Sequence, residues 1–109
     1  MIDVNALLQS TGIACRKTKF ASPPKAASYC VYFDAVSNEG PDLVPGLLRR
    51  HEISIQLYEY KPDEAAEHAL ETVLDGAYID WSRSDREWIQ EEQLYLVVYT
   101  FSFFEKRSL

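Results

Sequence analysis

An alternation of apolar and polar residues runs from position 49 to position 60. Ile53, Ile55 and Leu57 share one face of an extended chain, and polar residues separate them. Strict alternation predicts a half-buried strand. A second run, residues 29–33, is β-branched and aromatic and is bounded by breakers, so it also predicts a strand.

Apolar residues recur at helical spacing in two segments. The first covers residues 3–11, with Asp3 as its N-cap and Gly12 as the residue that ends it. The second begins at Pro62 or Asp63 and ends at Gly76. Its apolar stripe consists of Ala66, Ala69, Leu70, Val73 and Leu74.

The remaining segments connect these elements or add strands to them. We expect an extended polar segment at 13–20, strand pieces at 78–83 and 88–90, and a strand at 94–104. Between and after them we expect a break at 21–25, a long loop at 37–46, a turn at 91–93 and a frayed tail at 105–109. The element order is therefore α-β-β-β-α-β-β. Connections this short favour antiparallel pairing, so we predict a single α+β domain over residues 1–109, with two helices on one face of the sheet.

The last strand is apolar or aromatic on both faces. Its even positions carry Leu94, Leu96 and Val98, and its odd positions include Tyr95, Tyr99, Phe101 and Phe103. Helices can cover only one face of a sheet, so the other needs a different cover. We expect a partner subunit on that second face, and the predicted contact residues are Tyr58, Tyr95, Tyr99, Phe101 and Phe103. The alternative is a sheet that curls over and covers itself.

Two further groups are candidates for contacts. Leu43 and Val44 are apolar residues inside the polar 37–46 loop, and they are predicted docking residues. Asp63, Glu64, Glu67 and Glu71 form the polar side of the second helix. That side is interpreted first as a solvated helix face and second as an acidic wall or docking patch.

Composition and charge exclude several classes of function. Hydrophobic residues make up 47% of the 109 residues, which excludes a mostly disordered chain. A net charge of −6 argues against binding nucleic acid through its phosphates or docking on an anionic membrane. No signal peptide or membrane-spanning run is evident, so we expect a cytosolic protein.

Motifs for catalysis or metal binding are absent from the sequence. His51 and His68 lack a Cys or second His at ligand spacing, so we expect no metal and no cofactor. Cys15 and Cys30 are interpreted as unpaired thiols, although a cross-strand disulfide is an alternative if Pro23-Pro24 lies in a turn between two antiparallel strands. A thiol enzyme built on Cys15 and His51 is the least favoured function.

The layout resembles the tail-completion or tail-terminator proteins of long-tailed bacteriophages and prophages. The resemblance rests on the order of Ser10-Thr11-Gly12-Ile13, Pro23-Pro24, Tyr29-Cys30-Val31-Tyr32-Phe33, the strand 53–61, the helix after Pro62-Asp63, and the hairpin with Trp88-Ile89-Gln90-Glu91-Glu92 and Leu94-Tyr95-Leu96-Val97-Val98-Tyr99. It covers almost the whole chain, but the 37–46 loop is less typical of the family.

This resemblance implies a structural protein without catalysis. Such proteins form a ring, usually of six subunits, that caps the tail tube, joins it to the neck or connector protein, and lets DNA pass without specific binding. We accordingly expect the protein to be in the host cytoplasm during assembly and at the head–tail junction of the finished virion. An acidic lumen would suit the passage of DNA. The alternative function is another phage neck protein or cytosolic adaptor that binds a protein partner as a dimer.

Overall fold

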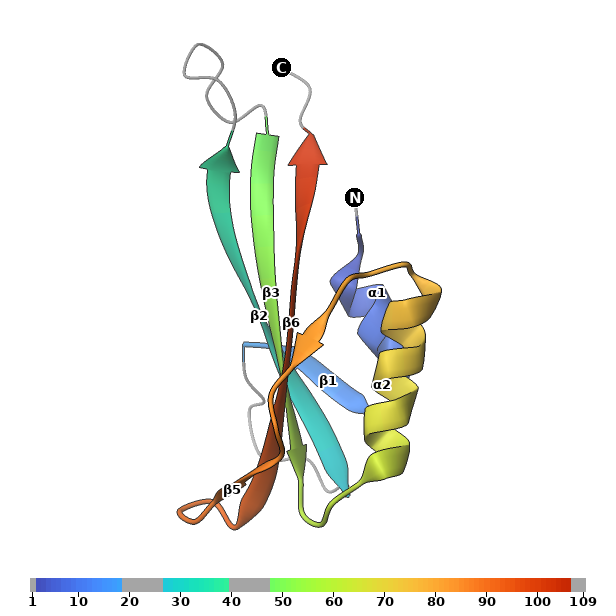
Figure 1. The fold of residues 1–109 in the computed structure, drawn as a ribbon, viewed down its shortest axis with the longest axis vertical. Coiled ribbons are helices and arrows are strands. Elements are labelled where there is room, and N and C mark those ends of the chain that lie inside the picture. The colour runs from blue at the N-terminus through green and yellow to red at the C-terminus, as the bar shows by residue number, and fades with distance from the viewer. Residues whose placement is uncertain (1, 19–26, 40–47, 107–109) are drawn as a thin grey trace.

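The computed structural model describes residues 2–18, 27–39 and 48–106 (Figure 1). The elements are α1 (Val4–Gln9), β1 (Ala14–Lys17), β2 (Ser28–Glu39), β3 (Leu48–Glu59), α2 (Glu64–Gly76), β4 (Ser82–Arg83), β5 (Glu87–Ile89) and β6 (Leu94–Lys106). Their order, α-β-β-β-α-β-β-β, confirms the predicted α+β class. It holds one more strand than expected because the two strand pieces after α2 pair separately with β6.

Both helices begin as the sequence predicts. The Asp3 carboxylate accepts a hydrogen bond from the Ala6 amide at 3.1 Å, and the Asp63 carboxylate accepts one from the Ala66 amide at 3.0 Å. Such caps satisfy amide groups that have no partner inside the helix. After α1, Gly12 has φ +80°, a conformation in which a side chain is strained.

The strands form one sheet in the order β1-β2-β3-β6-β4, and β5 pairs with another part of β6. Every pair is antiparallel except β1 with β2, which is parallel. An antiparallel hairpin around Pro23-Pro24 was one way to bring Cys15 and Cys30 together, and that arrangement is wrong. Prolines mark a break but do not determine the direction in which the next strand returns.

The long central strands continue into polar sequence, beyond the apolar runs that predicted them. β2 runs on to Glu39, so the first part of the predicted 37–46 loop is strand, and Leu43 and Val44 lie outside the described residues. The extension is polar, but it pairs with β3 up to Glu39 opposite Leu48. Backbone pairing with β3 therefore continues the strand where apolar side chains do not.

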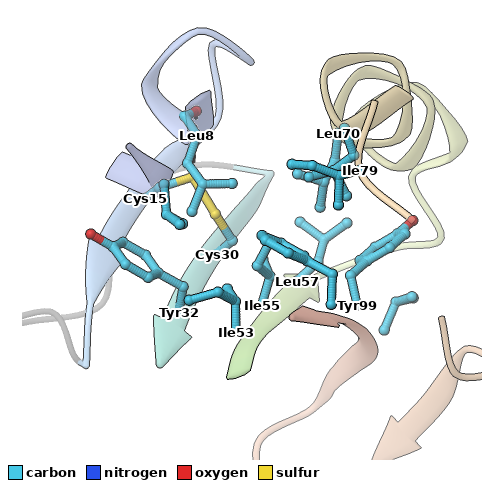
Figure 2. Packing of buried hydrophobic residues seen from close by; sticks show 14 of the residues in the cluster. Leu8, Cys15, Cys30, Tyr32, Ile53, Ile55, Leu57, Leu70, Ile79 and Tyr99 are labelled. Atoms are coloured by element: carbon cyan, nitrogen blue, oxygen red, sulfur yellow. Dashed lines mark hydrogen bonds between the residues drawn. A yellow bond between two sulfur atoms is a disulfide. The ribbon is translucent and has the colours of Figure 1, made fainter. Parts of the chain in front are cut away.

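The core lies between the two helices and one face of the sheet (Figure 2). Leu8 from α1 and Leu70 and Leu74 from α2 are fully buried against that face. The strands contribute Ile53, Ile55, Leu57, Val97, Tyr99 and Phe101 to the same cluster. This face holds the odd-numbered residues of β3 and β6, and we call it the helix face; the opposite side of the sheet is the free face.

Cys15 and Cys30 form a disulfide, which corrects the prediction of unpaired thiols. The two residues lie directly opposite each other in β1 and β2, with their Cα atoms 4.7 Å apart. Both are buried, and Leu8 lies over the bond in Figure 2. The sequence could not decide this pairing because it depends on the parallel register of two strands that are separated by a break.

The molecule is elongated. Its radius of gyration is 15.5 Å, whereas a compact domain of this length has about 13 Å. Figure 1 shows the cause: the upper ends of β2, β3 and β6 project beyond the helices and the short strands. We call this projection, residues 34–39, 48–52 and 102–106, the arm. The helix-covered remainder of the chain is the body.

Candidate functional site

The structure reverses the expected roles of the two faces of β6. Tyr99 is fully buried and Phe101 is 6% exposed, and both belong to the core beneath the helices. The assumption that these side chains lie on the uncovered face is wrong. The uncovered face carries Leu96 and Val98 instead, which are half-buried. The alternation of the strand defines two faces, and only the position of the helices decides which one is covered.

The other three predicted contact residues lie in different places. Tyr58 is half-buried on the free face, where its ring stacks on Tyr29 with centroids 5.2 Å apart. Tyr95 packs edge-on against Trp88 at 4.9 Å. Phe103 is on the arm and is also half-buried. The five predicted residues therefore do not form one surface, and whether Tyr58, Tyr95 and Phe103 contact a partner stays a prediction.

The acidic residues of α2 do not form one solvated face either. Of the four residues predicted to form that face, only Glu64 is exposed; Glu67 is 5% exposed, and Glu71 and Asp63 are partly buried. Asp63 caps the helix and also accepts a hydrogen bond from the Ser28 hydroxyl at 2.7 Å. The interpretation of these four residues as a common wet face is therefore wrong, and α2 alone does not supply an acidic wall.

Two arginines hold the buried carboxylates of α2. The Arg83 guanidinium donates to Glu67 at 3.2 Å and to Glu71 at 3.0 Å. The Arg86 guanidinium donates to Glu67 at 2.8 Å and to the buried Glu59 of β3 at 3.3 Å. The network ties α2 to the segment that carries β4 and β5, because both arginines come from that segment.

Burial perturbs the ionisation of this network. Burial and the neighbouring negative charge of Glu67 raise the pKa of Glu59 to about 7, although Arg86 opposes the shift. One oxygen of the Glu59 carboxylate has no hydrogen-bond partner. A buried carboxylate with an unsatisfied oxygen favours its protonated form. These groups connect elements of the body, and we interpret them as structural.

The arm differs from the body because it exposes large apolar side chains close to unpaired strand edges. Val36 is 50% exposed and Phe104 is 57% exposed, and Phe33 at the base of the arm is 38% exposed. In addition, β1 pairs with β2 only as far as Tyr32, and β4 pairs with β6 only as far as Thr100. The arm therefore presents apolar side chains and open strand edges together, which is typical of an interaction surface.

An imidazole holds the three strands of the arm together. His51 of β3 contacts the carboxylate of Asp34 in β2 at 2.9 Å and that of Glu105 in β6 at 3.0 Å. Its ring stacks on Phe103 at 4.7 Å. The hydrogen bond with Glu105 raises the pKa of His51 most; burial opposes that shift and Asp34 adds to it. Both ring nitrogens can donate only in the charged form, so this geometry favours imidazolium.

The structure does not support the thiol-enzyme interpretation. Cys15 is bonded to Cys30, and His51 is held by carboxylates on the arm. A shallow hollow of about 460 Å³ at the base of the arm includes Arg50 and Glu52, which pair with each other. Among the described residues, no group of His, Cys, Asp and Glu could hold a metal ion. No helix in that part of the chain is long and apolar enough to cross a membrane.

Comparison with known proteins finds likenesses of fold among solved structures. No protein-family profile matches the chain, and no curated protein matches it in sequence. A solved structure described as the virion of a native gene transfer agent (GTA) particle contains a chain that superposes with a TM-score of 0.60. The two chains are 15% identical, and the match covers 94% of this chain and 83% of the other. At this identity the match shows a shared fold.

Sequence reasoning missed His51 and Glu59 as the centres of the two charged clusters. The signal was present, because both residues continue the inward-facing series Ile53, Ile55 and Leu57 of the alternating strand. A charged or titratable residue on the buried side of a strand requires partners. Arg83 and Arg86 carried no comparable signal, because they lie in a polar bend whose position only the tertiary structure determines.

Proposed function

We propose that this chain is a structural protein of a phage-type virion, specifically a tail terminator that caps the tail tube and joins it to the neck. The observation that carries the proposal is the match of fold with a gene transfer agent virion chain over nearly the full length of both. The order of sequence segments that resembles the tail-terminator family supports the finer assignment. Its partners would be further copies of itself, the tail tube protein and a neck or connector protein.

The proposed role requires no catalysis. Both cysteines are bonded to each other, and the buried carboxylates of the body are engaged by arginines. We propose that DNA passes through the assembled ring without specific binding, as the net charge of −6 favours. Glu64 and Asp75 are the acidic residues of α2 that are exposed enough to contribute charge to a lumen.

The arm is the feature of this fold that suits assembly. It exposes Val36 and Phe104 beside strand edges that are unpaired among the described residues, although Tyr78 and Trp88 of the body are exposed as well. The protein would be made in the host cytoplasm and would act at the head–tail junction of the particle.

The experiment that tests the function combines genetics with imaging. The gene is removed from the producing strain, and the released particles are examined by negative-stain microscopy and mass spectrometry. We expect separate heads and tails, with restoration by the intact gene, and we expect the protein in purified wild-type particles. Its absence from those particles, or whole particles in the deletion strain, would overturn the proposal.

Light scattering of the purified protein over a wide concentration range distinguishes the alternative. A ring of about six subunits agrees with a tail terminator, whereas a strict dimer at all concentrations favours the adaptor. If the purified protein is a monomer, it is mixed with isolated tail tubes. Microscopy of the mixture then shows whether the protein caps the tubes.

A further inference from the structure

Tyr78, two residues after the end of α2, is exposed and has an unfavourable backbone conformation. It is 97% exposed, more than any other large apolar residue among those described. Its φ is +58°, in the left-handed region that disfavours bulky side chains. Within the described residues its side chain has no hydrogen bond, ion pair or ring contact. Nothing inside the chain therefore offsets the strain at Tyr78.

The way in which α2 ends requires this conformation. The Tyr78 amide donates to the Asp75 carbonyl at 3.0 Å, and the Ile79 amide donates to the Leu74 carbonyl at 3.1 Å. These two bonds define a Schellman motif, whose left-handed position is usually occupied by Gly. Gly76, the predicted end of the helix, lies two residues too early for that role. A large exposed ring thus occupies the position where Gly would be more stable.

The neighbours of Tyr78 fix it in its outward orientation. Ile79 is buried, and Ala77 packs against the core cluster. The Trp81 indole donates to the Asp75 carboxylate at 2.9 Å, which closes the segment across Tyr78. The aromatic side chain is therefore carried by an ordered segment before any partner binds. Such pre-organisation lowers the entropy lost on binding.

The surroundings of Tyr78 are acidic. Asp75 and Asp80 are both exposed, and residues 62–82 contain six acidic residues and no Lys or Arg. The two arginines that follow this segment are engaged by the buried carboxylates of the body. The exposed carboxylates beside Tyr78 are thus available to a positively charged surface.

Resting on the proposed function, we propose that Asp75, Tyr78 and Asp80 form a docking surface for a basic protein of the particle. The Tyr78 ring enters an apolar cleft of that partner, and the two carboxylates meet Lys or Arg at its rim. Burial of the ring then offsets the strain that the free chain carries. A second copy of this chain is a poorer match, because each copy has a net charge of −6. The occupant is a different protein.

Glycine substitutions at two left-handed positions separate strain from docking. Thr18 is also exposed and has φ +71°. Tyr78→Gly and Thr18→Gly should each raise the melting temperature of the purified protein by about 4 °C, because both relieve strain. In a producing strain that lacks the native gene, Tyr78→Gly should lower the yield of whole particles that contain the chain at least tenfold. Thr18→Gly should leave the yield unchanged, and an unchanged yield with Tyr78→Gly would overturn the proposal.

Two further substitutions test the chemistry of the surface. Tyr78→Phe keeps the ring and should support at least half of the wild-type particle yield. Asp80→Lys reverses a charge beside the ring and should lower the yield at least threefold. Asp85→Lys, at an exposed position in the bend after β4, is the matched control and should have no such effect. Equal yields with the two lysine variants would contradict a basic partner.

Photocrosslinking tests the identity of the occupant. Particles are produced with p-benzoylphenylalanine in place of Tyr78, irradiated and analysed by mass spectrometry. We expect a covalent product between this chain and a different particle protein, linked near Lys or Arg residues. A product that joins two copies of this chain would overturn the choice of occupant, and the absence of any product would overturn the docking surface.

The proposed function and this docking surface can fail separately. If wild-type particles lack this chain, the virion role itself is wrong. If the chain is present and Tyr78→Gly particles form normally, the docking surface is wrong and the virion role stands.

Discussion

The body and the arm are built on the same three strands, but different interactions hold them. In the body, β3 and β6 bury one face under two helices, and Ile55, Leu57 and Val97 are fully buried there. In the arm, the strands continue without helices, and His51 with its two carboxylates connects them. The comparison indicates that the body supplies the stability of the fold, whereas the arm keeps apolar groups and strand edges available for contact.

The strongest test of this comparison places one charge in each region. Phe101 and Phe104 belong to the same strand, but Phe101 is 6% exposed in the core and Phe104 is 57% exposed on the arm. Phe101→Asp should destabilise the protein by at least about 4 kcal/mol, because it buries an unpaired carboxylate. Phe104→Asp should change stability by about 0.5 kcal/mol or less. Urea denaturation measures both, and equal effects would contradict the division into body and arm.

The disulfide belongs to the body, and its loss should have the next largest effect. Cys15 and Cys30 are separated by 15 residues in sequence. Closing a loop of that length stabilises a fold by about 3 kcal/mol. Cys15→Ser/Cys30→Ser should therefore lower the free energy of unfolding by about that amount.

A matched measurement compares the wild type with and without reductant. Reduction should destabilise the wild type and leave the double variant unchanged. If the two cysteines were unpaired thiols, neither the substitution nor the reductant would produce this loss.

Glu59 makes the stability of the body depend on pH. Its pKa is raised from 4.5 to about 7 in the folded state, so the folded protein binds the extra proton between those values. The resulting stability is complete below about pH 4.5 and is lost as the pH rises through 7. Glu59→Gln should remove this pH dependence, which amounts to about 2 to 3 kcal/mol between pH 5 and pH 8. Urea denaturation at pH 5 and at pH 8 measures the free energy of unfolding. Glu64→Gln, at an exposed position, is the control and should leave the pH dependence unchanged.

His51 should have a smaller effect that is confined to the arm. Its pKa is raised from 6.5, so the stability that it adds is complete below about pH 6.5 and is lost as the pH rises through its higher folded value. In the Glu59→Gln background, which removes the pH dependence of the body, amide hydrogen exchange in 34–39 and 102–106, corrected for intrinsic rates, should accelerate relative to the body over that range. His51→Gln should abolish the difference; an equal response in the body would show that the arm is not an independent unit.

Much of the fold was predictable from local patterns. Asp3 caps α1 as predicted, Asp63, one of the two predicted starts of the second helix, caps α2, and the alternation at 49–60 predicted β3 to within one residue at each end. The predicted contact surface was less accurate, because Tyr99 and Phe101 were placed on the uncovered face and the structure buries them. Periodicity identifies which residues share a face, but it contains no information about which face a distant helix will cover.

The sequence by itself determined the element types, their order and the inward series that includes His51 and Glu59, because these depend on neighbours within a few residues. Tertiary structure decided the parallel pairing that joins Cys15 to Cys30, the reach of Arg83 and Arg86 to the acids of α2, and the extension of the strands into an arm. These features depend on groups far apart along the chain. Their energies arise from register and packing, which no local pattern encodes.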